Sequence, residues 1–261
     1  MVRVGLAVGG AVLVLLGGAA LTWASVPGAA ESTVTPVDGI SGVELNGGSG
    51  DVEIRYVPGA RGEVREEVRR SWWGGGGSGP AHRVEGGELR LDAECGWNCE
   101  VRYWVTLPAP VPVSGELGSG DLDVDGMTSV DARVGSGGVE LRRVAGPVVV
   151  KASSGEVTLK DIGGDVDVES SSGGIDADDL RGARFRADVS SGSVSARLAA
   201  PQDVDIHTGS GGIDLSVPSG GYRVESDTGS GGEEIGVAQD PNAPRQLRLS
   251  TGSGSIEVKP L

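Results

Sequence analysis

Acidic residues recur at one position of a repeated pattern, and they are the side chains of this chain best suited to binding chemistry. The pattern is a Ser-Gly pair followed, after one residue, by an apolar, a polar and another apolar residue, and one of its copies has Glu233 at the first of these three positions. The polar position is acidic in seven of nine copies. In chain order it is occupied by Glu53, Asp123, Glu140, Thr158, Asp176, Ser195, Asp214, Glu234 and Glu257.

If the copies stack on one another, these side chains form a single column with neighbours about 5 Å apart. Carboxylate oxygens are the ligands that Ca²⁺ prefers, so the column could hold Ca²⁺ or contact a basic partner. The alternative is that exposed acids keep a sheet soluble and block lateral stacking. Ca²⁺ is the one cofactor candidate, and its candidate ligands are Asp123, Glu140, Asp176, Asp214 and Glu257.

Catalytic chemistry has weak support in this sequence. A Gly-X-Ser-X-Gly nucleophile motif is absent, and His207 is flanked by Ile206 and Thr208 as in an exposed strand. Paired carboxylates could hydrolyse a glycosidic bond, but any two acids of the column would qualify and none is singled out. We therefore predict no catalytic residues and no organic cofactor, and keep a carbohydrate-active enzyme as a remote alternative.

Two further pairs of residues are candidates for a disulfide and for a partner contact. Cys95 and Cys99 are the only cysteines and are expected to form a disulfide across a tight turn, since a zinc site needs about four ligands. Trp72 and Trp73 precede a glycine run, where adjacent indoles on a loop could contact a partner. The alternative for the tryptophans is that one of them packs over the end of the core.

The elements that must position these residues are short strands. From Gly120 onward the glycines of the repeated pairs follow one another at steps of 17, 18, 18, 19, 19, 20 and 23 residues. That period holds two strands and two turns, and segments such as 130–134 and 203–207 alternate apolar and polar residues as a half-buried strand does. We predict an all-β, single-stranded β-solenoid with coils of 17–20 residues.

Residues 111–261 follow the repeat regularly, whereas residues 31–110 do not. The latter are predicted to start the solenoid and to carry an inserted cap hairpin within 56–110. Its two arms are expected to be residues 88–94 and 100–107, closed by the Cys95–Cys99 turn.

The first 30 residues are predicted to be a targeting segment. Residues 4–25 are uncharged and long enough to cross a bilayer as a helix, which favours a membrane anchor. A signal peptide cleaved near Ala30 is the alternative. Both place the repeats outside the cell membrane. The net charge of −15 argues against nucleic acid as a partner.

The repeated Ser-Gly-X-(Val/Ile)-(Asp/Glu)-(Leu/Val) units, preceded by Val105-Thr106-Leu107-Pro108, resemble the DUF4097 "putative adhesin" or toast-rack β-repeat domain over residues 40–261. The resemblance implies a β-repeat fold, export or membrane attachment in bacteria, and no catalytic residues.

The sequence therefore predicts a non-enzymatic scaffold at the bacterial cell surface that binds an envelope protein or glycan. It would be held in the membrane with its repeats extracellular, or secreted if cleaved. A regulatory partner of another membrane protein, acting in envelope stress, is the main alternative.

Overall fold

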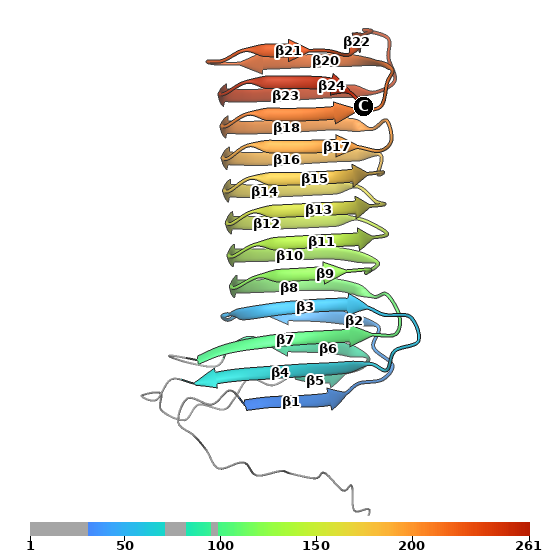
Figure 1. Ribbon diagram of the computed structural model, residues 1–261, viewed down its shortest axis with the longest axis vertical. Helices are drawn as coiled ribbons and strands as arrows, with labels where there is room; N and C mark the ends of the chain where they lie inside the picture. Colours follow the sequence, from blue (N-terminus) through green and yellow to red (C-terminus); the bar gives the residue numbers. More distant parts are fainter. Residues whose placement is uncertain (1–30, 71–81, 95–98) are drawn as a thin grey trace, which may run out of the picture.

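The computed structural model describes residues 31–70, 82–94 and 99–261, and these residues form 24 strands in two sheets (Figure 1). The all-β prediction is confirmed for this part of the chain. None of its segments is a helix long and apolar enough to span a membrane. The predicted anchor or signal helix, residues 4–25, lies outside the described residues.

Each coil gives one strand to each sheet, and the two sheets face each other across the core. Sheet 1 contains, in spatial order, β1 (Glu31–Pro36), β4 (Glu63–Arg70), β7 (Cys99–Leu107), β3 (Gly50–Tyr56), β9 (Leu122–Asp125), β11 (Val139–Val144), β13 (Val157–Ile162), β15 (Ile175–Leu180), β17 (Val194–Leu198), β19 (Ile213–Val217), β24 (Ile256–Pro260) and β21 (Glu233–Ile235).

Sheet 2 lies opposite and has the same number of strands. It contains, in spatial order, β22 (Ala238–Gln239), β20 (Gly221–Thr228), β23 (Gln246–Ser253), β18 (Asp203–Ser210), β16 (Arg184–Ser191), β14 (Val166–Ser172), β12 (Val148–Ser154), β10 (Ser129–Ser136), β8 (Pro112–Ser119), β2 (Gly42–Asn46), β6 (Glu88–Asp92) and β5 (His82–Glu85).

Pairing within both sheets is parallel and in register through the central coils, as between β10 and β12 or β11 and β13. Period-two alternation sends one residue in two inward, where Val, Leu, Ile and Ala fill the core. Aromatic residues make up only 3% of the sequence, which predicts a core too narrow to hold them, but this prediction is wrong. Phe185, Tyr103 and Tyr222 are all buried, and Phe185 lies in register between Val166 and Val204.

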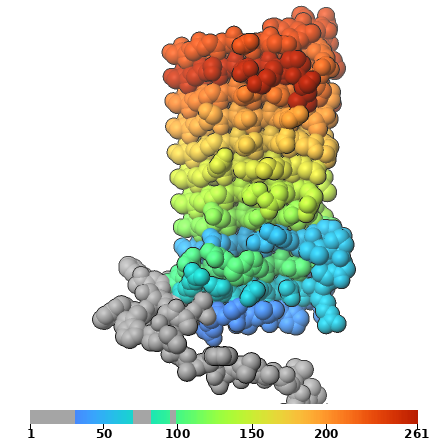
Figure 2. Space-filling model, in the orientation of Figure 1, coloured from blue at the N-terminus to red at the C-terminus, as the bar shows by residue number. Residues whose placement is uncertain are grey.

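The order of the coils differs from the order of the sequence at both ends of the stack. The coil of β2 and β3 lies between the coil of β6 and β7 and the coil of β8 and β9. Likewise the last coil, β23 and β24, lies below the coil formed by β20, β21 and β22. In Figure 2 this appears as a dark-red band beneath an orange-red one, and as a blue band between two green ones.

The predicted cap hairpin is also corrected by the strand pairing. Residues 88–94 and 100–107 do not pair with each other, because β6 belongs to sheet 2 and β7 to sheet 1. Instead β6 forms an antiparallel hairpin with β5, and β7 pairs antiparallel with β4. The segments are therefore the two sides of one coil, which adds a parallel layer to β2 and β3.

Candidate binding surfaces

The predicted acidic column exists on the outer face of sheet 1. Strand register aligns Glu53 with Asp123, Asp123 with Glu140, and Asp214 with Glu257, and the other positions complete the row. One detail differs from the sequence order: Glu257 lies between Asp214 and Glu234, because β24 is inserted between β19 and β21. The column is therefore continuous along the stack, with its last two members exchanged.

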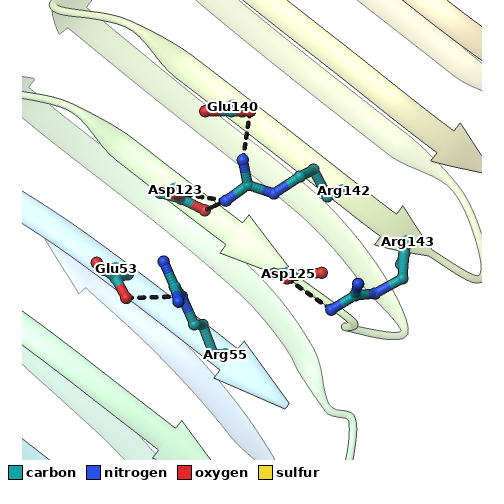
Figure 3. Close-up of polar contacts among 7 residues, drawn as sticks. All are labelled: Glu53, Arg55, Asp123, Asp125, Glu140, Arg142 and Arg143. Atoms are coloured by element: carbon teal, nitrogen blue, oxygen red, sulfur yellow. Dashed lines mark hydrogen bonds and ion pairs between the residues drawn. The ribbon is translucent and has the colours of Figure 1, made fainter. Parts of the chain in front are cut away.

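Basic residues neutralise much of this column. The guanidinium of Arg142 donates to both carboxylate oxygens of Asp123 at 2.8 Å and also to Glu140, so one arginine joins two neighbouring coils (Figure 3). Burial lowers the pKa of Arg142, but the charges and hydrogen bonds of the two carboxylates outweigh it and raise the pKa above the usual value. Glu53 pairs at 2.6 Å with Arg55, which lies on the same strand.

A second bridge of this kind lies near the other end of the stack. Lys259 Nζ lies 3.0 Å from Asp214 and 3.1 Å from Glu257, and these hydrogen bonds raise the pKa of the lysine. Asp176, whose neighbours in register are Thr158 and Ser195, forms no ion pair with another described residue. Acids of the column are thus held by bases rather than gathered around a common centre.

The geometry gives no support to Ca²⁺ binding. Within residues 31–70, 82–94 and 99–261, no three acidic, histidine or cysteine side chains are grouped closely enough to hold a metal ion. The bases that hold the acids were missed in the sequence, although a signal was there. Arg55, Arg142 and Lys259 each follow an acid of the column by two residues, and a strand places such residues on the same face.

Beside the column, one more acid is paired and largely buried. Asp125 accepts a hydrogen bond from Arg143 at 2.7 Å through one carboxylate oxygen, while its other oxygen is buried without a partner among the described residues (Figure 3). Arg143 itself has a φ of 51°, an unusual conformation for a residue with a side chain. This pair fastens the end of β11 to the end of β9.

The other predicted site residues lie largely outside the described part of the chain. Trp72, Trp73 and Cys95 are all in this group, so the partner-contact prediction and the Cys95–Cys99 pairing stay predictions. Cys99, at the start of β7, is disulfide-bonded. His207 is exposed, and its Nδ1 lies 2.8 Å from the Ser250 hydroxyl, as expected of a surface histidine.

The outer face of sheet 1 also carries an aromatic residue that the sequence reasoning passed over. Trp104 of β7 lies in register with Glu53, and so extends the row of the acidic column toward the N-terminal end. The guanidinium carbons of Arg65 and Arg102 lie 5.8 and 5.7 Å from its ring centre, within the range of a cation–π contact.

Sheet 2 carries a groove that the sequence reasoning did not predict. It has a volume of about 690 Å³ and crosses the strands β8, β10, β12, β14 and β16. One side is a row of charged residues and the other is a row of small residues next to the turns. In chain order the charged row is Glu116, Arg133, Lys151, Glu169 and Asp188, and the small row is Gly118, Gly135, Ser153, Ser171 and Ser190.

Ion pairs tie the charged row together. Arg133 lies 3.5 Å from Glu116, and Lys151 lies 2.8 Å from Glu169. The hydrogen bond from Lys151 holds the pKa of Glu169 below its ordinary value. Arg133 and Lys151 are neighbours in register, and each forms an ion pair with an acid on the side away from the other base. The groove therefore presents two adjacent hydrogen-bond donors, Arg133 and Lys151, with acceptors on either side of them.

A smaller hollow of about 400 Å³ lies near the other end of β12, β14 and β16 and extends to β18. It is lined by side chains that include Val149, Asp167, Arg184 and Arg186. Both hollows are therefore on sheet 2, whereas sheet 1 carries the paired charge columns. The two outer faces differ in shape as well as in chemistry.

The comparison with protein families identifies the fold. Residues 105–259, more than half of the chain, match the family described as Toastrack DUF4097. The chain belongs to the Toastrack DUF4097 family. The resemblance expected from the repeated Ser-Gly units is thereby confirmed, and the Toastrack region comprises the coils from β8 to β24 together with the end of β7.

Solved structures that are similar to this chain come from bacteria. A "putative adhesin" from Bacteroides fragilis is 13% identical, with a TM-score of 0.55, and the match covers 88% of this chain and 97% of that one. A "putative adhesin" from Parabacteroides distasonis is 14% identical, with a TM-score of 0.42 and the same coverage. No curated protein matches the sequence.

Proposed function

We propose that this Toastrack chain is an exported, non-enzymatic binding module that attaches to a component of the bacterial envelope through the outer face of sheet 2. The observation that carries the proposal is the groove of about 690 Å³ across five parallel strands. A stack of in-register coils is stiff, because each coil pairs with its neighbours on both sides. Such a stack presents one elongated recognition surface.

The arrangement of acids supports binding rather than catalysis. Glycoside hydrolysis needs one carboxyl group kept protonated in an apolar pocket and a second one that stays ionised nearby. Here Asp123 and Glu140 are bound by the same guanidinium on an open sheet face, and Asp214 and Glu257 share one ammonium group. These are the contacts of charged residues that hold coils together.

Export is part of the proposal and rests on the sequence. The uncharged residues 4–25 would hold the chain in the cell membrane with the coils outside, or the coils would be secreted after cleavage near Ala30. The bacterial structures of the same fold that are named as adhesins point in the same direction.

Sedimentation with envelope fragments tests the proposal. The purified full chain is mixed with bacterial envelope fragments and the bound fraction is measured over a range of protein concentrations. Saturable binding is expected, and the absence of saturable binding would overturn the proposal. Turnover of an envelope polysaccharide that one acid-to-amide change abolishes would also overturn it. Recovery of a single membrane protein in cross-linked complexes would favour the regulatory-partner alternative.

A further inference from the structure

We infer that the groove of sheet 2 binds an extended, neutral polysaccharide that lies along the axis of the stack; this rests on the proposed function and names the ligand class of that site. The inference follows from what the groove offers a ligand. Its lining is built from side chains and turns of β8, β10, β12, β14 and β16, which repeat the same positions in register.

The backbone of the groove is already engaged, which excludes an added peptide strand. Each of β10, β12 and β14 pairs with one strand on either side, so their amide and carbonyl groups bond to neighbouring coils. A peptide that binds by β-strand addition needs an open sheet edge, and the groove lies far from the edges of sheet 2. Recognition here must use side chains.

The hydroxyl groups of the small row are free to bind a ligand. Ser153, Ser171 and Ser190 lie at equivalent positions of three successive coils and form no side-chain hydrogen bond with any described residue. A serine hydroxyl donates one hydrogen bond and accepts two. Neighbouring coils are about 4.8 Å apart, so the hydroxyls repeat regularly along the groove, as the groups of a polymer do.

A buried hydroxyl without a partner among the described residues lies beneath the groove, on the inward face of β14. Ser170 also lines the groove and is only 4% exposed, and its Oγ has no hydrogen bond in the described structure. Thr208, at the corresponding position two coils on, donates its hydroxyl to the Gly211 carbonyl instead. Ser170 lies in register with the core residues Ala152 and Val189, so its hydroxyl faces the core, and a ligand can reach only the outward serines Ser153, Ser171 and Ser190.

The charges of the groove favour a neutral ligand. Three acids and two bases form the charged row, and both bases are already paired with acids of that row. An anionic polymer would meet the acids and a protein whose net charge is −15. A neutral chain rich in hydroxyl groups can instead bond in turn to carboxylates, to Lys151 and to the serines, because hydroxyls both donate and accept.

Envelope binding by matched variants tests the inference. Ser171→Tyr fills the middle of the groove, whereas Ser195→Tyr adds the same bulk to the outer face of sheet 1. We expect at least tenfold weaker binding to envelope fragments for the first variant and unchanged binding for the second. Lys151→Gln is expected to weaken binding about threefold, and Lys160→Gln, on sheet 1, to leave it unchanged. The inference would be overturned if the two serine variants, or the two lysine variants, changed envelope binding by the same factor.

The class of ligand is tested on the envelope fragments themselves. Periodate, which cleaves vicinal diols, is expected to abolish binding of the full chain, and protease treatment of the fragments is expected to leave it intact. Binding that survives periodate and is lost after protease treatment would overturn the inference in favour of a protein. Binding lost at high salt would overturn it in favour of an anionic polymer. If untreated fragments do not bind, the proposed function itself fails.

The fold of each variant is checked independently. Because Ser171 and Lys151 are exposed side chains on an outer face, their variants are expected to melt within a few degrees of the unchanged chain. A Ser171→Tyr chain that unfolds early is replaced in the comparison by Lys151→Gln, which adds no bulk. The lysine pair alone then decides between the two faces.

Discussion

Each coil turns at a glycine that follows a serine, and from Gly120 to Gly254 the backbone φ at these glycines lies between 109° and 154°. Residues with a side chain rarely adopt these angles. Contact with the next coil adds a second constraint. A Cβ atom on Gly173 would lie 1.9 Å from the carbonyl oxygen of Gly155, which leaves no room for it. The repeated glycine thus allows both the turn and the close stacking of turns.

Replacing one such glycine should be costly, whereas its neighbour in the chain should tolerate the change. Gly173→Ala is expected to lower the free energy of unfolding by about 1–3 kcal/mol, the usual cost of a strained backbone conformation. Gly174→Ala should change it by less than about 0.5 kcal/mol, because the nearest atom to its Cβ would be 3.4 Å away. Denaturant unfolding of both variants measures this. Similar destabilisation of both variants would contradict the conclusion that the turn requires glycine at position 173.

The Lys151–Glu169 pair predicts a pH dependence. Lys151 holds the pKa of Glu169 below the ordinary value of 4.5, so the folded chain favours the ionised carboxylate more than the unfolded chain does. This contribution is complete above pH 4.5 and is lost as the pH falls through the folded pKa. Because both side chains are about half exposed, it should not exceed about 1 kcal/mol.

Melting temperatures of the unchanged chain and of Glu169→Gln, measured from neutral to strongly acidic pH, test this. We expect the variant to melt slightly lower at neutral pH and the difference to vanish in acid. A difference that does not depend on pH would show that the carboxylate charge contributes nothing to stability.

At the scale of the strands, much of the fold could be predicted from the sequence. The alternation of Val139 and Leu141 with polar residues fixes which side of the strand faces inward, and both are buried. The repeat length fixes the pairing register, so Glu140 was correctly placed beside Asp123. These properties are local, because they depend on the period of the strand and on the length of the coil.

The order in which the coils stack could not be predicted from strand period and coil length. The β23–β24 coil carries the same repeat as the others, so nothing in its residues reveals that it lies between β19 and β21. The groove was missed for a related reason. Its charged row has two adjacent bases flanked by acids, and the pairing of Arg133 and Lys151 with those acids follows only once it is known which coils lie side by side.

Engineered cysteines can verify the inserted coil. In the structure Asp214 lies in register with Glu257, while Glu234 is one strand further on. Adjacent strands are about 4.8 Å apart, within the range of a disulfide, whereas next-but-one strands are about 10 Å apart and outside it. The pair Asp214→Cys with Glu257→Cys should therefore cross-link on mild oxidation, and Asp214→Cys with Glu234→Cys should not.

Peptide mapping of the oxidised chains by mass spectrometry distinguishes the new cross-link from a bond involving Cys95 or Cys99. The opposite result, with a cross-link between positions 214 and 234 only, would show that the coils stack in sequence order. The prediction concerns topology alone and does not depend on the function of the chain.

At the scale of the whole molecule, a parallel stack of coils has an open strand edge at each end, and such an edge can pair with another molecule unless something prevents it. At the C-terminal end the last layer of the core is partly polar. Ser226 lies in register with Leu249, and Glu233 with Ile256, so two polar residues occupy positions that are apolar in the neighbouring coil. The Ser226 hydroxyl donates to Glu233 at 2.7 Å. A polar layer of this kind opposes the stacking of a further coil from another molecule.

Restoring apolar residues in this layer should therefore promote association between molecules. The double change Ser226→Val and Glu233→Val extends the apolar core to the end of the stack, next to the backbone edge of β21. We expect the self-association constant to rise at least tenfold, about 1.4 kcal/mol, as measured by sedimentation velocity over a range of concentrations.

The matched control is Glu234→Val, which removes the same charge from the same strand but points outward. If the control associates as strongly as the double variant, loss of charge rather than the inward polar layer limits stacking. If neither associates, some other feature of the C-terminal coil ends the stack.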